Sequence, residues 1–173
     1  QQGGDVDVIP IKNSDQLLLF LKKEIDASWA PEPWVSRLIH EGNGYIFFDE
    51  RSLWPYGKFA SAVLIVSTKF MRENPDLTAK WVNEHVKLTE WIRANPIKAK
   101  TIINNSIAEL TGKKLSEKIL NDAFSRFEVT SDPMKPAILT AAKNAFSLGF
   151  LGKNRTDFEG LFDLSFLRQS VNE

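Results

Sequence analysis

Segment 59–67 constrains the fold of this chain more than any other, because it holds four consecutive apolar residues, Val-Leu-Ile-Val at 63–66. Uninterrupted apolar runs rich in β-branched residues are typical of strands buried on both faces of a sheet. Such a strand needs further strands beside it and helices to cover it. The segment therefore predicts a fold that contains a sheet, with this run as a crossover strand into a second structural unit.

Three shorter segments, residues 6–11, 25–29 and 45–48, also have the composition of strands. Helical patterns separate them. The first begins at Asn13, which forms a capping-box-like start with Gln16, and the second follows Pro33 and ends at Gly42. Strands and helices that alternate with short links predict a parallel α/β layer with right-handed crossovers.

The second half of the chain predicts four helices and a short fifth near Ser165. Three of the four begin with Asn or Asp followed by proline, at Asn74, Asn95 and Asp132, and the fourth begins at Ser116. Four apolar-faced helices with one strand cannot form a balanced sheet layer. We therefore expect the chain to be incomplete, with strands that precede residue 1 completing the second lobe.

Composition excludes several classes of site. The 22 basic and 22 acidic residues give a net charge of zero, so no broad electrostatic footprint for nucleic acid is expected. The chain has no cysteine, and its two histidines, His40 and His85, are too far apart in sequence for metal-ligand spacing. We expect no metal and no cofactor. His85 shares a helical stripe with Trp81 and is expected to be a packed residue rather than a catalytic one.

Two prolines flank Glu32 in the sequence Trp29-Ala-Pro-Glu-Pro-Trp34, and they make this corner stiff. Pro33 is expected as the first residue of a helix, with Glu32 at or next to the cap. Such a helix start directs free backbone N–H groups past the two indole rings of Trp29 and Trp34, which suits an anionic headgroup on an apolar body. The alternative is that both tryptophans simply pack and Glu32 only caps the helix.

The chain resembles the extracytoplasmic solute-binding proteins of sulfonate, nitrate and taurine ABC importers. The resemblance rests on segments 13–17, 24–34, 49–59 and 91–96, of which Pro-Glu-Pro-Trp and Asp-Glu-Arg-Ser-Leu-Trp-Pro are the most specific. It implies an α/β fold of the type II periplasmic-binding-protein kind, with two lobes and a cleft between them. Residues 1–58 would form most of the second lobe, and residues 59–173 the crossover strand and the returning helical part of the first lobe.

The resemblance also implies a function, which is to bind a small organic anion of the alkanesulfonate, taurine or nitrate-like kind. Trp29, Glu32, Pro33 and Trp34 are expected to face the cleft, with Lys58 and Phe59 near the crossover. Glu32 either meets the ammonium group of a zwitterion such as taurine or points away and serves the cap. Lys58 either adds a charge for the anion or is an exposed lysine.

The partners implied are the membrane permease and the ATPase of an ABC importer. The location implied is periplasmic or extracellular, with a lipoprotein tether as one form and the signal segment outside these residues. Two other classes stay open. One is an enzyme on the same fold, similar to a desulfinase or a thiamin pyrimidine synthase. The other is a non-binding fragment that serves as an interaction module, and uncovered apolar faces also favour self-association of the chain.

Overall fold

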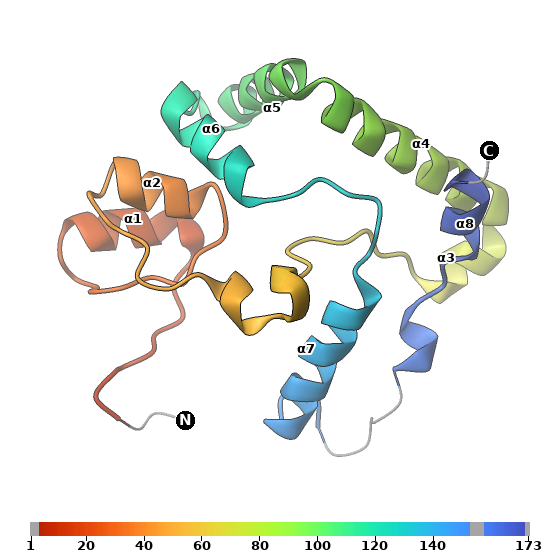
Figure 1. Cartoon of the computed structure of the whole chain (residues 1–173), viewed down its shortest axis with the longest axis horizontal. Helices are drawn as coiled ribbons and strands as arrows, with labels where there is room; N and C mark the ends of the chain where they lie inside the picture. Colours follow the sequence, from red (N-terminus) through yellow and green to blue (C-terminus); the bar gives the residue numbers. More distant parts are fainter. Residues whose placement is uncertain (1–3, 153–157, 172–173) are drawn as a thin grey trace. The chain divides into compact units, whose positions relative to one another are not determined.

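The structure is a computed structural model that describes residues 4–152 and 158–171, and its elements are helices joined by extended segments (Figure 1). The α-helices are α1 (Asn13–Leu21), α2 (Trp34–His40), α3 (Thr68–Glu73), α4 (Pro75–Ala94), α5 (Pro96–Thr111), α6 (Glu117–Arg126), α7 (Lys135–Ser147) and α8 (Ser165–Val171). Three 3₁₀ turns are η1 (Glu50–Leu53), η2 (Pro55–Gly57) and η3 (Glu159–Leu161).

The chain divides into two units, each with its own contacts. Unit 1 comprises residues 1–48 and 100–128, and unit 2 comprises residues 49–99 and 129–173. Each unit is therefore assembled from two separate stretches of the sequence. The division expected at residue 58 corresponds to the two lobes of the periplasmic-binding-protein fold, and it stays a prediction.

Unit 1 is built on α2, which packs against α1 and against α6 (Figure 1). Leu17 of α1, Leu38 of α2 and Ile119 of α6 are buried apolar residues of this unit. The end of α2 approaches α1 closely, because a Cβ atom added at Gly42 would lie 2.7 Å from the Leu38 carbonyl oxygen and 3.1 Å from Phe20 Cδ1. Glycine is therefore required where α2 ends, as the sequence predicts.

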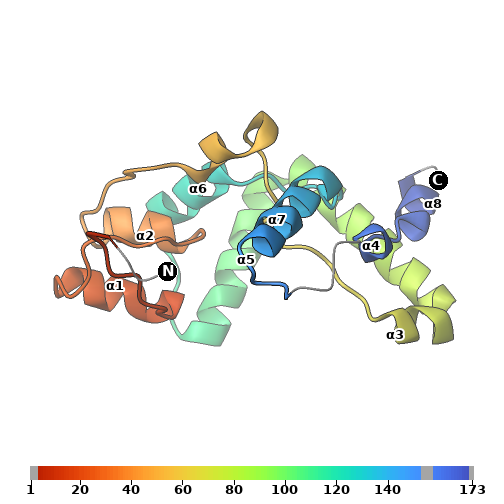
Figure 2. The same cartoon turned by 90° about the horizontal axis from the view of Figure 1, so that it is seen from below.

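Unit 2 contains the long helix α4, which packs against α3 and against α8 (Figure 2). Its buried residues on α4 are Thr78, Val86 and Thr89. Thr78 also donates a hydrogen bond from Oγ1 to the Asn74 carbonyl oxygen at 2.9 Å, which ties the first turn of α4 to its cap. The side of α4 that is buried is thus partly polar.

The helix starts expected in the second half are confirmed at Pro75, Pro96 and Ser116. Ser116 caps α6 by accepting a hydrogen bond from the Ile119 amide. The helix expected from Asp132 begins slightly later, at Lys135, and Asp132 Oδ1 accepts a hydrogen bond from the Met134 amide at 2.8 Å. Helix α8 begins at Ser165 as expected, whereas α3 was not anticipated.

The expected α/β fold of the type II periplasmic-binding-protein kind is wrong for this structure. Among residues 4–152 and 158–171 there is no strand and no sheet. The four expected strands, at residues 6–11, 25–29, 45–48 and 59–67, are extended or irregular segments without ladder partners. A strand can bury its backbone polar groups only against another strand, so composition alone does not create a sheet.

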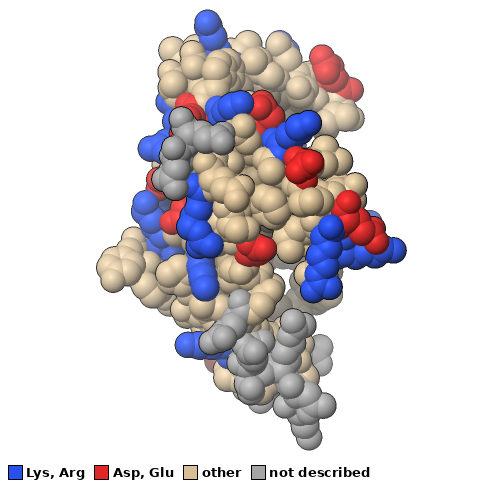
Figure 3. Space-filling model, turned by 90° about the vertical axis from the view of Figure 1, so that its right-hand side faces the viewer, with Lys and Arg blue, Asp and Glu red and all other residues tan. Residues whose placement is uncertain are grey.

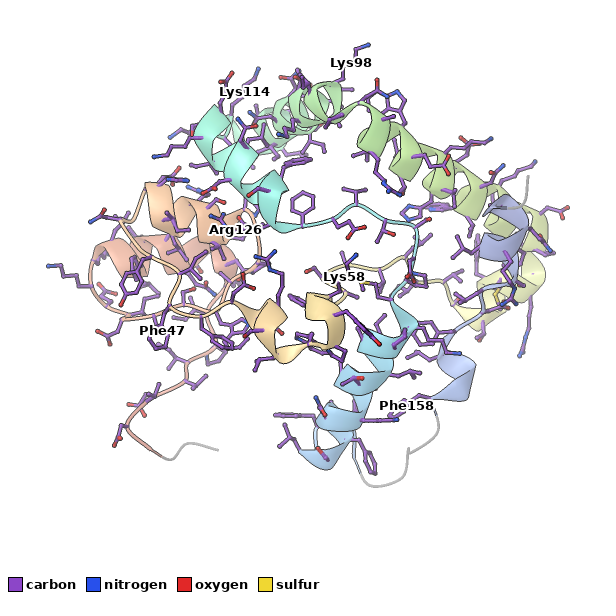
Figure 4. All side chains as sticks on the ribbon, viewed as in Figure 1. Phe47, Lys58, Lys98, Lys114, Arg126 and Phe158 are labelled. Atoms are coloured by element: carbon purple, nitrogen blue, oxygen red, sulfur yellow. The ribbon has the colours of Figure 1, made fainter. Side chains whose placement is uncertain are left out.

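The run at 63–66 is the clearest error, because it was expected to be buried on both faces. Val63, Leu64 and Val66 are each nearly half exposed, and Ile65 is 84% exposed. Segment 45–48 behaves in the same way, and Figure 4 labels its Phe47, which is 90% exposed. These side chains lack the second layer that would cover them.

The apolar stripe on α4 is also exposed. His85, expected as a packed residue, is exposed, and Trp81 beside it is 61% exposed. A shallow depression on this face is lined by Leu77, Lys80, Trp81, Glu84, His85 and Leu88. The sequence pattern located the apolar face of α4 correctly. In the structure that face is exposed, and a different side of the helix is buried.

The total accessible surface is large for the mass of the chain, and many large apolar side chains are exposed. The accessible surface is 13571 Å² for 19.6 kDa. Two separate folded bodies sharing this mass would expose only about 10,000 Å².

On the face drawn in Figure 3, basic and acidic side chains are interspersed among uncharged ones, and the net charge of the whole chain is zero. Charge repulsion therefore offers little opposition to association.

We predict that the 173-residue chain associates in solution, because association covers apolar side chains such as Phe47 and Ile65. Sedimentation velocity over a range of protein concentrations should show a mass that rises with concentration. Phe47→Lys and Ile65→Lys should each shift the chain toward monomer. A monodisperse monomer at all concentrations would contradict the prediction.

Candidate functional site

The corner expected to bind a ligand lies in unit 1, between the extended segment 25–30 and α2. Pro33 is the cap residue of α2, and the helix itself begins at Trp34, one residue later than expected. The Glu32–Pro33 peptide bond is cis. Gln16 of α1 accepts a hydrogen bond from the Ser28 hydroxyl, which fastens the segment before the corner to α1.

The amide protons at the start of α2 are not available to a ligand. The amides of Trp34 and Val35 both donate to the Pro31 carbonyl oxygen, at 2.9 and 3.3 Å. The Ser36 amide donates to Glu32 Oε2 at 3.1 Å, and the Arg37 amide donates to the Pro33 carbonyl oxygen. The expected cradle of unpaired amide protons is therefore occupied from within the corner.

Glu32 is held by Arg126, which lies at the C-terminal end of α6 (Figure 4). Arg126 Nη1 donates to Glu32 Oε1 at 2.9 Å and to Ser36 Oγ at 2.8 Å. The Glu32 side chain is 11% exposed and that of Arg126 is 21% exposed. Both Glu32 oxygens thus have protein partners, so Glu32 caps α2 and pairs with a cation of the same unit.

The same guanidinium binds a second carboxylate. Arg126 Nη2 donates to Asp122 Oδ2 at 2.9 Å, and His40 Nε2 lies 2.6 Å from the same oxygen. Ser36 and His40 are one turn apart on α2, and Asp122 and Arg126 are one turn apart on α6. We call these four residues and Glu32 the Arg126 cluster.

Hydrogen bonds shift the protonation equilibrium of Asp122. The hydrogen bond from Arg126 is the largest cause and that from His40 the next, and together they hold the pKa of Asp122 below its ordinary value of 3.8. The carboxylate is therefore the form that stabilises the packing of α2 on α6.

The two tryptophans of the corner differ in their surroundings. Trp29 is 69% exposed, and its ring centroid lies 6.4 Å from that of Phe48. Trp34 is partly buried, and the guanidinium carbon of Arg37 lies 4.9 Å from its ring centroid. Arg37 Nε and Nη2 both donate to Glu41 Oε2, at 3.0 and 2.9 Å. An aromatic surface and a guanidinium therefore adjoin at the start of α2.

Lys58 and Phe59 belong to unit 2. Phe59 stacks on Trp54 with ring centroids 5.6 Å apart, and Trp54 Nε1 donates to Glu50 Oε1 at 3.1 Å. Lys58 follows η2 and is exposed. The segment before them forms η1 and η2. Of the six expected ligand-binding residues, the structure thus brings Trp29, Glu32, Pro33 and Trp34 together in one unit.

A family model provides the identification. The model of the NMT1-like family matches residues 1–106, which is more than half of the chain and includes the whole corner. The chain belongs to the NMT1-like family. No curated protein and no solved structure matches it. This family includes solute-binding proteins of sulfonate, nitrate and taurine importers, and the match does not select one of these subfamilies.

The match to the NMT1-like family includes α2 but not α6, so Asp122 and Arg126 lie beyond the matched residues. The sequence analysis also missed these two residues. Their only signal is spacing, since Ser36 and His40 on α2 and Asp122 and Arg126 on α6 are polar pairs four residues apart. Nothing in that spacing indicates that the two pairs face each other.

Among residues 4–152 and 158–171, no group of three or more His, Asp or Glu side chains is arranged to hold a metal ion. Among the helices of the same residues, none is both long enough and apolar enough to span a bilayer.

We predict that Arg126→Met lowers the free energy of unfolding by about 2–3 kcal/mol, because it leaves two carboxylates without their shared cation. Urea denaturation followed by circular dichroism measures this change. Arg93→Met is a matched control, since Arg93 is exposed on α4. The control should change the free energy of unfolding by less than about 0.5 kcal/mol. Equal effects of the two substitutions would contradict the role given to Arg126.

The lowered pKa of Asp122 predicts loss of stability in acid. A carboxyl group with a lower pKa in the folded state stabilises folding above its unfolded pKa, here near 3.8, and this stabilisation is lost as the pH falls through the folded value. Urea unfolding between pH 6 and pH 2 should show a shallower acid decline for Asp122→Asn than for the natural chain. Parallel declines would contradict this assignment.

Proposed function

We propose that this chain acts as the solute-binding component of an ABC importer and binds a small organic anion of the alkanesulfonate, taurine or nitrate-like kind. The observation that carries the proposal is the match of residues 1–106 to the NMT1-like family. The partners of such a component are the membrane permease and the ATPase of the importer. Its place is outside the cytoplasm, where solute is captured.

The corner provides suitable chemistry for the apolar part of such a solute. Trp29 has most of its surface exposed, and Trp34 lies five residues further along the chain at the start of α2. Indole rings supply large, rigid apolar surfaces for a short carbon chain. Both rings belong to unit 1, so this contact does not require unit 2.

Arg37 is the cation that we propose meets the charge of the solute. Its guanidinium lies over the Trp34 ring, and its side chain is 28% exposed. A guanidinium has five N–H donors, and Glu41 accepts from two of its nitrogens, Nε and Nη2. Donors beyond those two suit the oxygens of a sulfonate, and they replace the α2 amides as the source of charge-assisted hydrogen bonds.

A binding experiment with propane-1-sulfonate tests this proposal. Trp34→Ala removes an aromatic wall and Arg37→Met removes the cation, so each should weaken binding about tenfold or more. Isothermal titration calorimetry measures the affinity directly. Binding by the natural chain with no effect of either substitution would contradict the location of the site.

Two matched controls accompany these variants. Trp81→Ala removes an exposed tryptophan from α4, and Arg93→Met removes an exposed arginine from the same helix. Neither residue belongs to the corner or to the Arg126 cluster, so neither change should alter the affinity for propane-1-sulfonate. No binding of any organic anion by the natural chain would contradict the proposed function itself.

An enzyme is the second candidate, and no observation on the described residues favours it over binding. His40 and Asp122 form a histidine–carboxylate contact next to the corner. Arg126 shares that carboxylate, and Ser36 in the same cluster is fully buried. The Arg126 cluster is therefore better suited to hold two helices together than to reach a substrate.

A further inference from the structure

We propose that Arg126 determines which solutes the corner accepts, because its ion pair with Glu32 removes the carboxylate from the ligand-binding surface and so favours organic anions without an ammonium group. This inference rests on the proposed function for the identity of the site. The inference goes beyond the proposed function, because it excludes the zwitterionic members of the solute class. It also assigns a specificity role to Arg126, a residue on α6.

Little of the Glu32 carboxylate is available to a solute. Oε1 accepts from Arg126 Nη1 at 2.9 Å, and Oε2 accepts from the Ser36 amide at 3.1 Å. The side chain is only 11% exposed. Each carboxylate oxygen can accept a further hydrogen bond, but this burial leaves little of Glu32 open to an ammonium group at the corner. A zwitterion such as taurine therefore brings a cationic group that Glu32 is poorly placed to meet.

The Arg126 cluster also weakens the negative charge that a solute meets at Glu32. The cluster holds the carboxylates of Glu32 and Asp122, the guanidinium of Arg126 and the imidazole of His40. Each Arg126 terminal nitrogen binds one carboxylate, and His40 adds a second contact to Asp122. Glu32 consequently repels a nearby anion less than an isolated carboxylate would.

A second ion pair close to the corner lies on α2. Arg37 and Glu41 form a pair at 2.9 Å with side chains 28% and 33% exposed, so this pair is more open to a solute than Glu32 is. Arg37 also lies over the Trp34 ring. A simple organic anion can thus be met by the partly exposed Arg37 guanidinium, while the Glu32 carboxylate stays paired with Arg126.

Arg126 acts through Glu32 and is a positioning residue, so the test must separate its effect on charge from its effect on folding. Propane-1-sulfonate and taurine form a matched pair of probes, because both carry a sulfonate and only taurine carries an ammonium group. The natural chain should bind propane-1-sulfonate about tenfold or more tightly than taurine. Equal affinities would overturn the inference.

Substitutions assign this preference to the two residues. Arg126→Met should release the Glu32 carboxylate and reduce or invert the preference for propane-1-sulfonate. Adding Glu32→Gln to Arg126→Met should restore it, even though Asp122 also loses its cation in both variants. Arg93→Met, the matched control, should leave the preference unchanged. An unchanged preference in Arg126→Met would overturn the inference.

A measurement without any solute separates this inference from the proposed function. With Trp54, Trp81 and Trp91 changed to phenylalanine, the fluorescence comes from Trp29 and Trp34 alone. At constant ionic strength, Arg126→Met should reduce quenching by iodide and increase quenching by caesium, each about 1.5-fold, and Glu32→Gln should reverse both changes.

The outcomes are then distinct. Failure of both sulfonates to bind contradicts the proposed function, and the quenching data still decide whether Arg126 neutralises Glu32. Unchanged quenching in Arg126→Met overturns the inference. If circular dichroism shows that Arg126→Met does not fold, Glu32→Gln alone carries the test. Its affinity for taurine should not fall, and a fall would identify Glu32 as an ammonium ligand and overturn the inference.

Discussion

The ion pair between Glu32 and Arg126 joins residues 94 positions apart and is the interaction on which unit 1 most depends. The apolar core of unit 1 is small, and its buried apolar side chains on α2 and α6 are those of Leu38, Ile119, Leu120 and Ala123. Apolar contacts of that size are not directional. The guanidinium supplies direction, because its two terminal nitrogens bind one carboxylate from each side of the α2–α6 contact. The register of the two helices follows from these bonds.

The same interaction changes which groups of the corner are available to a ligand. An extended proline-rich segment that enters a helix was expected to offer unpaired amide protons to an anion. In the structure, Glu32 and the carbonyl groups of Pro31 and Pro33 accept from those amides. Glu32 is therefore a structural group. The Trp34 ring and the Arg37 guanidinium remain as the chemistry that an organic anion can use.

The sequence predicted the helices well and the sheet wrongly, for a physical reason. A helix satisfies its backbone within a few residues, so local signals such as Asn74-Pro75 and the Ser116 cap are sufficient to locate it. A strand satisfies its backbone only through a partner that local sequence does not specify. Residues 63–66 have the composition of a buried strand, but no described strand lies beside them and they are exposed.

The candidate site was predicted in the same uneven way. Trp29, Glu32, Pro33 and Trp34 are neighbours in sequence, so their proximity in space required no knowledge of the fold. Arg126 could not be linked to them, because pairing across 94 residues depends on how α6 packs on α2. The family match extends through residue 106 and gives no information about it.

Glu32 and Arg126 act as one unit, and a double-mutant cycle measures the coupling between them. The free energies of unfolding of Glu32→Gln, Arg126→Met and the double variant are compared with that of the natural chain. We predict a coupling of about 1 kcal/mol or more, because either single change already breaks the shared ion pair. Strictly additive effects would show that Glu32 and Arg126 stabilise unit 1 independently.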